Sequence, residues 1–256
     1  MTTGAIVQAR MGSSRLPGKV LMRLGGETVL SHVLRRCAAV RGVDVVCCAT
    51  TEAGEDDAVA CEAERVGARV FRGSAQDVLA RYQGAAHAVG CDTVLRVTAD
   101  CPLIDPEVCA SVLALRRDRS ADYACNNMPP SWPHGLDCEA FTTAVLDAAA
   151  TAAVSPHERE HVTPWMRAAP HLSKANLPGP GGRAAEQRWT LDYPEDKALL
   201  DAIFAQLGEG AVTAGWRAVW DAVERHPEIA ALNRNRRDAQ RLDAMRATAS
   251  AAPARN

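Results

Sequence analysis

The sequence predicts an α/β fold, a mostly parallel sheet with helices on both faces and a small extension. Short apolar runs of strand length alternate with stretches in which apolar residues recur at helical spacing. Glycine, serine and basic residues follow the first run, as they do at the ligand-binding edge of such sheets. The alternation changes near Asp122, where two apolar runs follow one another with no helix between them. These three observations favour one large domain with an added lobe.

The first half of the chain repeats a strand–helix unit. The first strand is expected at residues 4–9, and apolar residues then recur at helical spacing from Leu30 to Cys37. Further strands are expected at residues 43–50, 68–71 and 93–98, and further helices at residues 55–66, 76–89 and 106–116. Parallel strands need such crossover helices, which must cover both faces of the sheet.

The second half is less regular. Strands at residues 123–126 and 136–141 flank a proline-rich turn, and helices follow from about Thr142 and from Pro156. A late strand is expected at residues 189–192 and an amphipathic helix around residues 199–207. We therefore expect a domain at residues 1–225, with an extension at about 122–187 inside it. Residues 226–256, rich in Ala and Arg, are expected to be a solvated helix or frayed tail.

Composition excludes several classes of protein. The chain has 256 residues and a formal net charge of −2, so it lacks the broad positive field of nucleic-acid-binding proteins. Its apolar runs fall far short of the ~20 residues that a membrane helix needs, and its start has no charged region or cleavage site of a signal peptide. The nine cysteines include no C-x-x-C pair and lie mostly in apolar stretches. We expect a cytoplasmic protein with reduced thiols and no nucleic-acid or membrane partner.

The loop after the first strand predicts an anion site. Gly12, Ser13 and Ser14 allow backbone N–H groups to approach an anion, and three cations share the loop: Arg10, Arg15 and Lys19. The loop is not a Walker A motif, because five residues separate Gly12 from Gly18 and Val20 stands where Ser or Thr is needed. A surface loop with scattered charges is the alternative, but the pattern favours a triphosphate site.

With this loop, the sequence resembles the cytidylyltransferase family, which includes CMP-KDO synthetases, acylneuraminate cytidylyltransferases and spore-coat polysaccharide cytidylyltransferase-like proteins. The last group is the most similar. Over residues 4–207 the resemblance rests on the segments QARMGSSRLPGKVL, DVLARY, RVTADCPLI, GLDCE, EREHVTP and RWTLDYPED, in that order. Several spaced motifs are more specific than any single one.

The resemblance implies a three-layer, Rossmann-like (GT-A-like) nucleotidyltransferase domain that uses CTP. It implies catalytic roles for Arg10, Lys19 and Asp100. It also implies a nucleotide site made of Ala9, Arg10, Gly12, Ser13, Ser14, Arg15, Lys19, Thr50, Ser74, Asp77 and Thr98.

Two carboxylates predict a metal site. Asp100 follows an apolar strand, so its side chain is expected at the same sheet edge as the first loop. Asp192 ends the expected late strand. Together with triphosphate oxygens and water they suit Mg²⁺, or Mn²⁺. The alternative for Asp192 is a helix N-cap, because Tyr193 and Pro194 follow it.

The expected reaction places CMP from CTP on an acidic acceptor and releases pyrophosphate. An acceptor oxygen attacks the α-phosphorus in line, while metal and cations neutralise the developing charge. Acceptor-binding residues are expected in the extension: His134, Asp137, Glu139, Arg159 and His161. Alternation along a strand would place Asp137 and Glu139 on one face, although they could equally be solvated edge carboxylates. The expected acceptor is a sugar acid, a nonulosonate, or a phosphate- or phosphonate-bearing small molecule. The sequence leaves open whether the protein forms a homodimer.

The sequence is compatible with three other functions. His157, Glu158 and His161 match the H-E-x-x-H pattern of zinc hydrolases, but Pro156 and Pro164 confine the segment to about two helical turns. A GT-A glycosyltransferase should show a D-x-D pair where this chain has Ala99, Asp100 and Cys101. A non-catalytic nucleotide-binding module would not need Asp100 and Asp192 together with Arg10 and Lys19.

Overall fold

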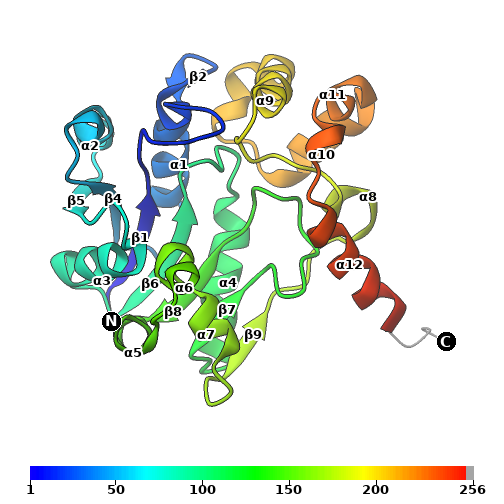
Figure 1. Cartoon of the computed structure of the whole chain (residues 1–256). Helices are drawn as coiled ribbons and strands as arrows, with labels where there is room; N and C mark the ends of the chain where they lie inside the picture. The colour runs from blue at the N-terminus through cyan, green and yellow to red at the C-terminus, as the bar shows by residue number, and fades with distance from the viewer. Residues whose placement is uncertain (252–256) are drawn as a thin grey trace.

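Helices cover both faces of a seven-stranded sheet in the computed structural model, which describes residues 1–251 (Figure 1). The strand order is β5-β4-β1-β6-β8-β7-β9. The strands are β1 (Thr3–Gln8), β4 (Val45–Thr51), β5 (Arg69–Gly73), β6 (Thr93–Thr98), β7 (Tyr123–Cys125), β8 (Glu139–Thr142) and β9 (Lys174–Asn176). All neighbouring pairs are parallel except β6–β8 and β8–β7. The predicted fold class is confirmed.

Alternation along the strands supplies a separate apolar core on each face. Ala5 and Val7 of β1 pack with α1 (Val29–Ala38), α2 (Asp57–Arg65) and α4 (Pro106–Asp118). Ile6, between them, packs on the other face with α3 (Val78–Val89) and α5 (Thr143–Ala152). The same two-residue period recurs in β4 and β6. Helices α6 (Pro156–His161) and α7 (Pro164–Ala168) join the α3 side.

Two predicted strands differ in the structure. The segment 189–192 forms no strand, so that prediction is wrong, because its backbone bonds to loops and not to a ladder: Trp189 N–H donates to the carbonyl of His134 and Leu191 N–H to that of Asp100. Strand β8 begins only at Glu139, because Asn126 Oδ1 accepts the N–H of Cys138 and holds it outside the ladder. Asp137 therefore precedes the strand and does not share its face with Glu139.

A third apolar cluster joins C-terminal helices to the sheet domain. It includes residues from α9 (Pro194–Leu207), α10 (Trp216–Arg225), α11 (Pro227–Ala231) and β2 (Arg23–Leu24), which pairs with β3 (Glu27–Thr28). Arg36 of α1 links the two parts, since its guanidinium donates to the carbonyls of Ile104, Ala211 and Ala214. Helices α7, α8 (Gly182–Ala185), α10 and α11 and strand β9 were not predicted.

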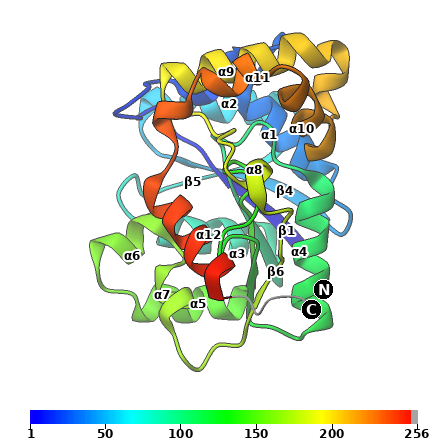
Figure 2. The same cartoon turned by 90° about the vertical axis from the view of Figure 1, so that its right-hand side faces the viewer.

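Helix α12 (Ala239–Ala251) lies on the side of the molecule that Figure 2 brings to the front. Its Arg241 donates to Oδ1 of Asp137 at 2.9 Å and to the carbonyl of Trp132 at 2.8 Å. Part of the predicted tail is thus a helix that contacts the extension, and residues 252–256 of that prediction lie outside the described residues. Within residues 1–251, no helix is both long and apolar enough to cross a membrane.

Candidate active site

A cavity of about 300 Å³ opens where β1 and β6 end. This is the carboxyl edge of the parallel strands, where open α/β sheets bind ligands. Its lining includes these predicted residues: Ala9, Arg10, Gly12, Ser13, Ser14, Arg15, Lys19, Thr98, Asp100, His161 and Asp192. It also includes residues that sequence reasoning missed: Gln8, Val20, Val78, Arg81, Ala99 and Glu160.

The loop after β1 is anchored by the buried carboxylate of Asp56. Met11 N–H donates to Oδ1 of Asp56 at 2.6 Å, while the N–H groups of Ser13 and Gly18 donate to the carbonyl of Met11 at 2.8 and 3.0 Å. Gly18 has a φ of 69°, in the left-handed region that favours glycine. Lys19 follows directly, and the turn carries its side chain inward, where only 11% of it is exposed.

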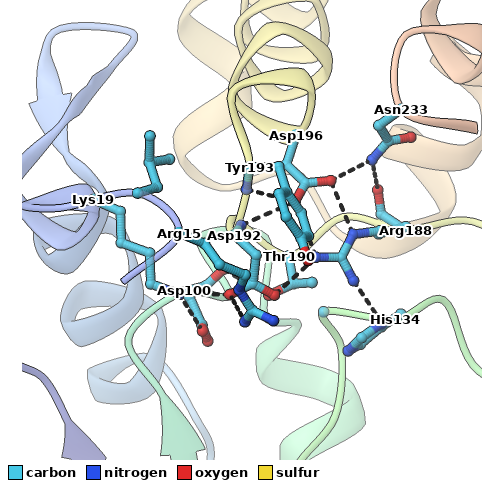
Figure 3. Close-up of polar contacts among 12 residues, drawn as sticks. Arg15, Lys19, Asp100, His134, Arg188, Thr190, Asp192, Tyr193, Asp196 and Asn233 are labelled. Atoms are coloured by element: carbon cyan, nitrogen blue, oxygen red, sulfur yellow. Dashed lines mark hydrogen bonds and ion pairs between the residues drawn. The ribbon is translucent and has the colours of Figure 1, made fainter. Parts of the chain in front are cut away.

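The ammonium group of Lys19 lies between the carboxylates of Asp100 and Asp192 (Figure 3). Nζ is 2.7 Å from Oδ2 of Asp100 and 2.9 Å from Oδ1 of Asp192. Burial alone would lower the pKa of Lys19, but the two carboxylates raise it overall. Burial would likewise raise the pKa values of both carboxyls, but Lys19 holds them below their usual range. All three groups are therefore charged at neutral pH.

Two arginines also hold Asp192. Nη2 of Arg15 is 2.7 Å from its Oδ1, and Nη2 of Arg188 is 2.8 Å from its Oδ2. The carboxylate of Asp196, not of Asp192, accepts backbone N–H groups at the start of α9, from Asp192 and Tyr193 at 2.9 and 3.1 Å. Asp192 therefore does not cap the helix, and its carboxylate faces the cationic loop.

Arg81 of α3 is a buried cation in the cavity wall. Its side chain has no ion pair with any described residue, and its Nε has no hydrogen-bond partner among them. Nη1 donates to the carbonyl of Ser74, and burial lowers the pKa of the guanidinium. A buried guanidinium without a carboxylate suits an anionic ligand. In the sequence, Arg81 could have been identified by its position in the first turn of the helix that follows β5.

Three of the predicted nucleotide-binding residues do not line the cavity. Thr50 is fully buried in β4, and its hydroxyl has no hydrogen-bond partner among the described residues. The hydroxyl of Ser74 accepts the backbone N–H of Asp77 at 3.0 Å. Asp77 caps α3 by accepting the N–H of Ala80 and also binds the guanidinium of Arg159. Asp77 and Ser74 thus shape the start of α3, which carries Arg81.

Glu139 is buried, contrary to the expectation of a side chain open to the acceptor. Its carboxylate accepts hydrogen bonds from Arg96, Arg167, Tyr123 and Thr163 and is 2% exposed. Burial would raise its pKa, but the two arginines and the hydrogen bonds lower it to about 2. Both carboxylate oxygens of Glu139 already accept hydrogen bonds from protein groups. We therefore infer that Glu139 positions Arg96 and Arg167.

The other predicted acceptor-side residues are dispersed. Asp137 is held by Arg241 of α12, and Arg159 is held by Asp77. His134 Nδ1 lies 3.3 Å from Nη1 of Arg188, and burial lowers its pKa. His161 alone of the five lines the cavity that contains Lys19.

The H-E-x-x-H segment does not form a metal centre in the described residues. Helix α6 has six residues, and the carboxylate of Glu158 accepts the backbone N–H of Ser155 in a capping box. The rings of His157 and His161 are 4.5 Å apart, but among residues 1–251 no group of three His, Cys, Asp or Glu side chains could hold a metal ion.

The mostly parallel sheet carries a cationic loop and two carboxylates at its carboxyl edge, an arrangement that suits an enzyme acting on a nucleotide. A family model described as cytidylyltransferase matches residues 4–186. The spore coat polysaccharide biosynthesis protein SpsF of Bacillus subtilis is 34% identical, with 80% of this chain and 87% of that protein covered. A solved cytidylyltransferase from Leptospira borgpetersenii is 30% identical with a TM-score of 0.85, over 90% of this chain and 97% of that one.

A 3-deoxy-manno-octulosonate cytidylyltransferase of Anaeromyxobacter dehalogenans is 37% identical over a shorter stretch, 42% of this chain and 44% of that protein. The chain therefore belongs to the cytidylyltransferase family, and the predicted resemblance and enzyme class are confirmed.

Proposed function

We propose that this enzyme transfers CMP from CTP to an acidic acceptor and releases pyrophosphate. The observation that carries the proposal is the cavity in which a glycine- and serine-rich loop and four cations meet the carboxylates of Asp100 and Asp192. The cations are Arg10, Arg15, Lys19 and Arg81. Such a set matches a triphosphate, whose negative charge needs several cations and backbone N–H donors.

The chain's own residues would act by position and charge. The loop would hold the triphosphate against the edge of the sheet, and Lys19 and Arg10 would neutralise charge that builds on it as pyrophosphate leaves. The acceptor oxygen would attack the α-phosphorus in line, so no protein nucleophile is required. The cysteines are consistent with this, since eight of the nine are buried and none of them lines the cavity.

Asp100 and Asp192 would hold Mg²⁺ or Mn²⁺. The two carboxylates converge on one cation, the ammonium of Lys19, at 2.7 and 2.9 Å, and oxygen donors of this kind suit a hard divalent ion. The ion would withdraw charge from the phosphate oxygens when it is bound.

The functions of two relatives suggest the class of acceptor. One acts in spore coat polysaccharide biosynthesis and another is a 3-deoxy-manno-octulosonate cytidylyltransferase. We extend to this chain the class of a sugar acid, a nonulosonate, or a phosphate- or phosphonate-bearing small molecule. Other features stay predictions. They are the division of the chain into a domain with an extension at about 122–187 and a tail at 226–256, the cytoplasmic location and the homodimer.

The test is pyrophosphate release by purified protein across the four ribonucleoside triphosphates and a panel of acidic acceptors, with magnesium or with EDTA. We expect release only with CTP, an acceptor and a divalent ion. Calorimetry of CTP binding with and without magnesium supplies a readout that needs no acceptor. Equal binding of CTP with EDTA present would contradict the metal assignment, and no binding of any nucleotide would contradict the proposal.

A further inference from the structure

The two carboxylate oxygens of Asp192 have different surroundings (Figure 3). Oδ1 accepts hydrogen bonds from Lys19 at 2.9 Å and from Arg15 at 2.7 Å, and both donors line the cavity. Oδ2 accepts a hydrogen bond from Nη2 of Arg188 at 2.8 Å, and Arg188 is not part of the cavity lining. Oδ2 is therefore held by the protein, whereas Oδ1 lies beside the loop that we propose for the triphosphate.

Arg188 is held in turn by the buried carboxylate of Asp196. Nε and Nη2 of Arg188 donate to Oδ1 and Oδ2 of Asp196, both at 2.9 Å. The side chain of Asp196 is fully buried, and that of Arg188 is 5% exposed. Because a bidentate pair fixes the plane of a guanidinium group, Asp196 determines where Nη2 of Arg188 lies relative to Asp192.

Asn233 contacts both members of this ion pair from the C-terminal part of the chain. Its Nδ2 donates to Oδ1 of Asp196 at 2.8 Å and to the backbone carbonyl of Arg188 at 2.9 Å. The residue is 1% exposed. Both hydrogens of the side-chain amide are thus used to hold Asp196 and Arg188 together.

Arg236 holds the residues that follow Asp192. Its guanidinium carbon is 4.3 Å from the centre of the Tyr193 ring, and its Nη2 binds Glu195 at 2.9 Å. The backbone N–H of Arg236 donates to the carbonyl of Asn233 at 2.8 Å, so the two residues belong to one turn. We call Asn233 and Arg236 the C-terminal brace.

We propose that the C-terminal brace positions the metal-binding carboxylate of Asp192. Through Asp196 and Arg188 it keeps Oδ2 of Asp192 occupied and presents Oδ1 to the metal ion. Without the brace, the guanidinium of Arg188 could turn and pair with both oxygens of Asp192, in competition with the ion. The inference rests on the proposed function, in which Asp192 holds Mg²⁺ or Mn²⁺, and it assigns positioning roles to residues outside the cavity.

The test measures CTP binding to the full chain by calorimetry, once with Mn²⁺ and once with EDTA. The ratio of the two Kd values gives the gain in affinity that the metal supplies, and it requires neither acceptor nor turnover. Asn233→Ala should lower this gain about tenfold, the scale of losing a hydrogen bond to a charged group, while Kd in EDTA stays within about twofold of wild type. Arg236→Gln, at a half-exposed position where folding should not be at risk, should lower the gain about threefold.

Each variant has a matched control. Asn176→Ala removes a side-chain amide that, like that of Asn233, joins two parts of the chain, since its Nδ2 donates to the carbonyl of Pro129 at 3.2 Å. Arg234→Gln is the same substitution as Arg236→Gln, made at an exposed position two residues earlier. Both controls should keep the wild-type gain, and thermal melts compare the stability that the two asparagine variants lose.

A wild-type gain in both brace variants would overturn the inference and leave the proposed function standing. An equal loss of gain in Asn176→Ala would also overturn it, because any destabilising change would then have the same effect. If Asn233→Ala does not fold, the result for Arg236→Gln decides. No gain from Mn²⁺ in the wild type would overturn the metal assignment and this inference with it, whereas CTP binding in EDTA would still support the nucleotide site.

Discussion

Nζ of Lys19 lies 2.9 Å from Oδ1 of Asp192, although 173 residues separate them in the chain. The first loop and the segment before α9 thus form one ionic cluster, with Asp100 as the third member. In this cluster each carboxylate pairs with a cation from the loop after β1. Mutations in either segment should therefore affect the same step.

Asp100→Asn and Asp192→Asn should each lower kcat by roughly a hundredfold or more, the scale of removing one electrostatic stabiliser. Because both contact Lys19 and would share one metal ion, the double variant should be little worse than either single one. Steady-state kinetics with a fixed acceptor measures this, and circular dichroism checks the fold. Full activity of Asp192→Asn would leave that residue only a structural role.

Lys19→Ala and Arg10→Ala should lower kcat by roughly a hundredfold, more than they lower CTP affinity. Both line the cavity that we propose for the triphosphate, so their contribution should grow as charge builds in the transition state. Single-turnover kinetics and CTP calorimetry separate the two effects. A rise in the KM for CTP with unchanged kcat would mean that they bind only the ground state.

Arg81→Lys should raise the KM for CTP about tenfold, because a planar donor fork is replaced by a point charge at a buried wall of the cavity. Its matched control is Arg117→Lys on the solvent side of α4, which should be neutral. Initial rates over a range of CTP concentrations give the result. Equal KM values in both variants would remove Arg81 from the nucleotide site.

Glu139→Gln should destabilise the protein by about 3 kcal/mol at pH 7, because it removes a buried carboxylate from two half-buried arginines. The folded pKa of Glu139, about 2, lies below its ordinary value, so its contribution is complete above about pH 4.5 and is lost as the pH falls toward 2. Urea unfolding of wild type and variant at pH 7, 4 and 3 should show a difference that shrinks with acid. A difference that is constant with pH would contradict the ionised pair.

Purified protein should carry no stoichiometric zinc, since Glu158 is used in a capping box and His157 and His161 have no third ligand among the described residues. Arg159→Ala should destabilise the start of α3, where Arg159 binds the capping residue Asp77, and weaken acceptor use through that change. Metal analysis and a thermal melt check the two statements. One zinc per chain that is lost in His161→Ala would establish the rival hydrolase site.

Local patterns in the sequence predicted the sheet well, and they predicted that the loop after β1 lies at its carboxyl edge. Apolar runs with helical stretches between them identify β1, β4 and β6, and Asp100 follows from its place at the end of β6. The spacing of apolar residues and the position of a residue at the end of a strand are local properties of the sequence, so they can be recognised without knowledge of the tertiary fold.

Long-range pairing explains what was missed. The sequence predicts Glu139 as an acceptor contact or an edge carboxylate, because local patterns do not show its bonds to partners from β6, β7 and the α6–α7 region. Arg81 looked like an ordinary helix residue, and only the fold buries it without a carboxylate. Residues 189–192 have strand composition, but their hydrogen bonds go to loops at Asp100 and His134.

The span between Lys19 and Asp192 also bears on how the chain is made. The loop with Arg15 and Lys19 leaves the ribosome long before the segment with Asp192, so its charges lack that partner for most of synthesis. The sheet core of β1, β4 and β6 can form earlier, since its contacts end near residue 98. During translation Lys19 can therefore pair with Asp100 as soon as β6 is in place, whereas Arg15 gains its partner Asp192 only when the late segment docks.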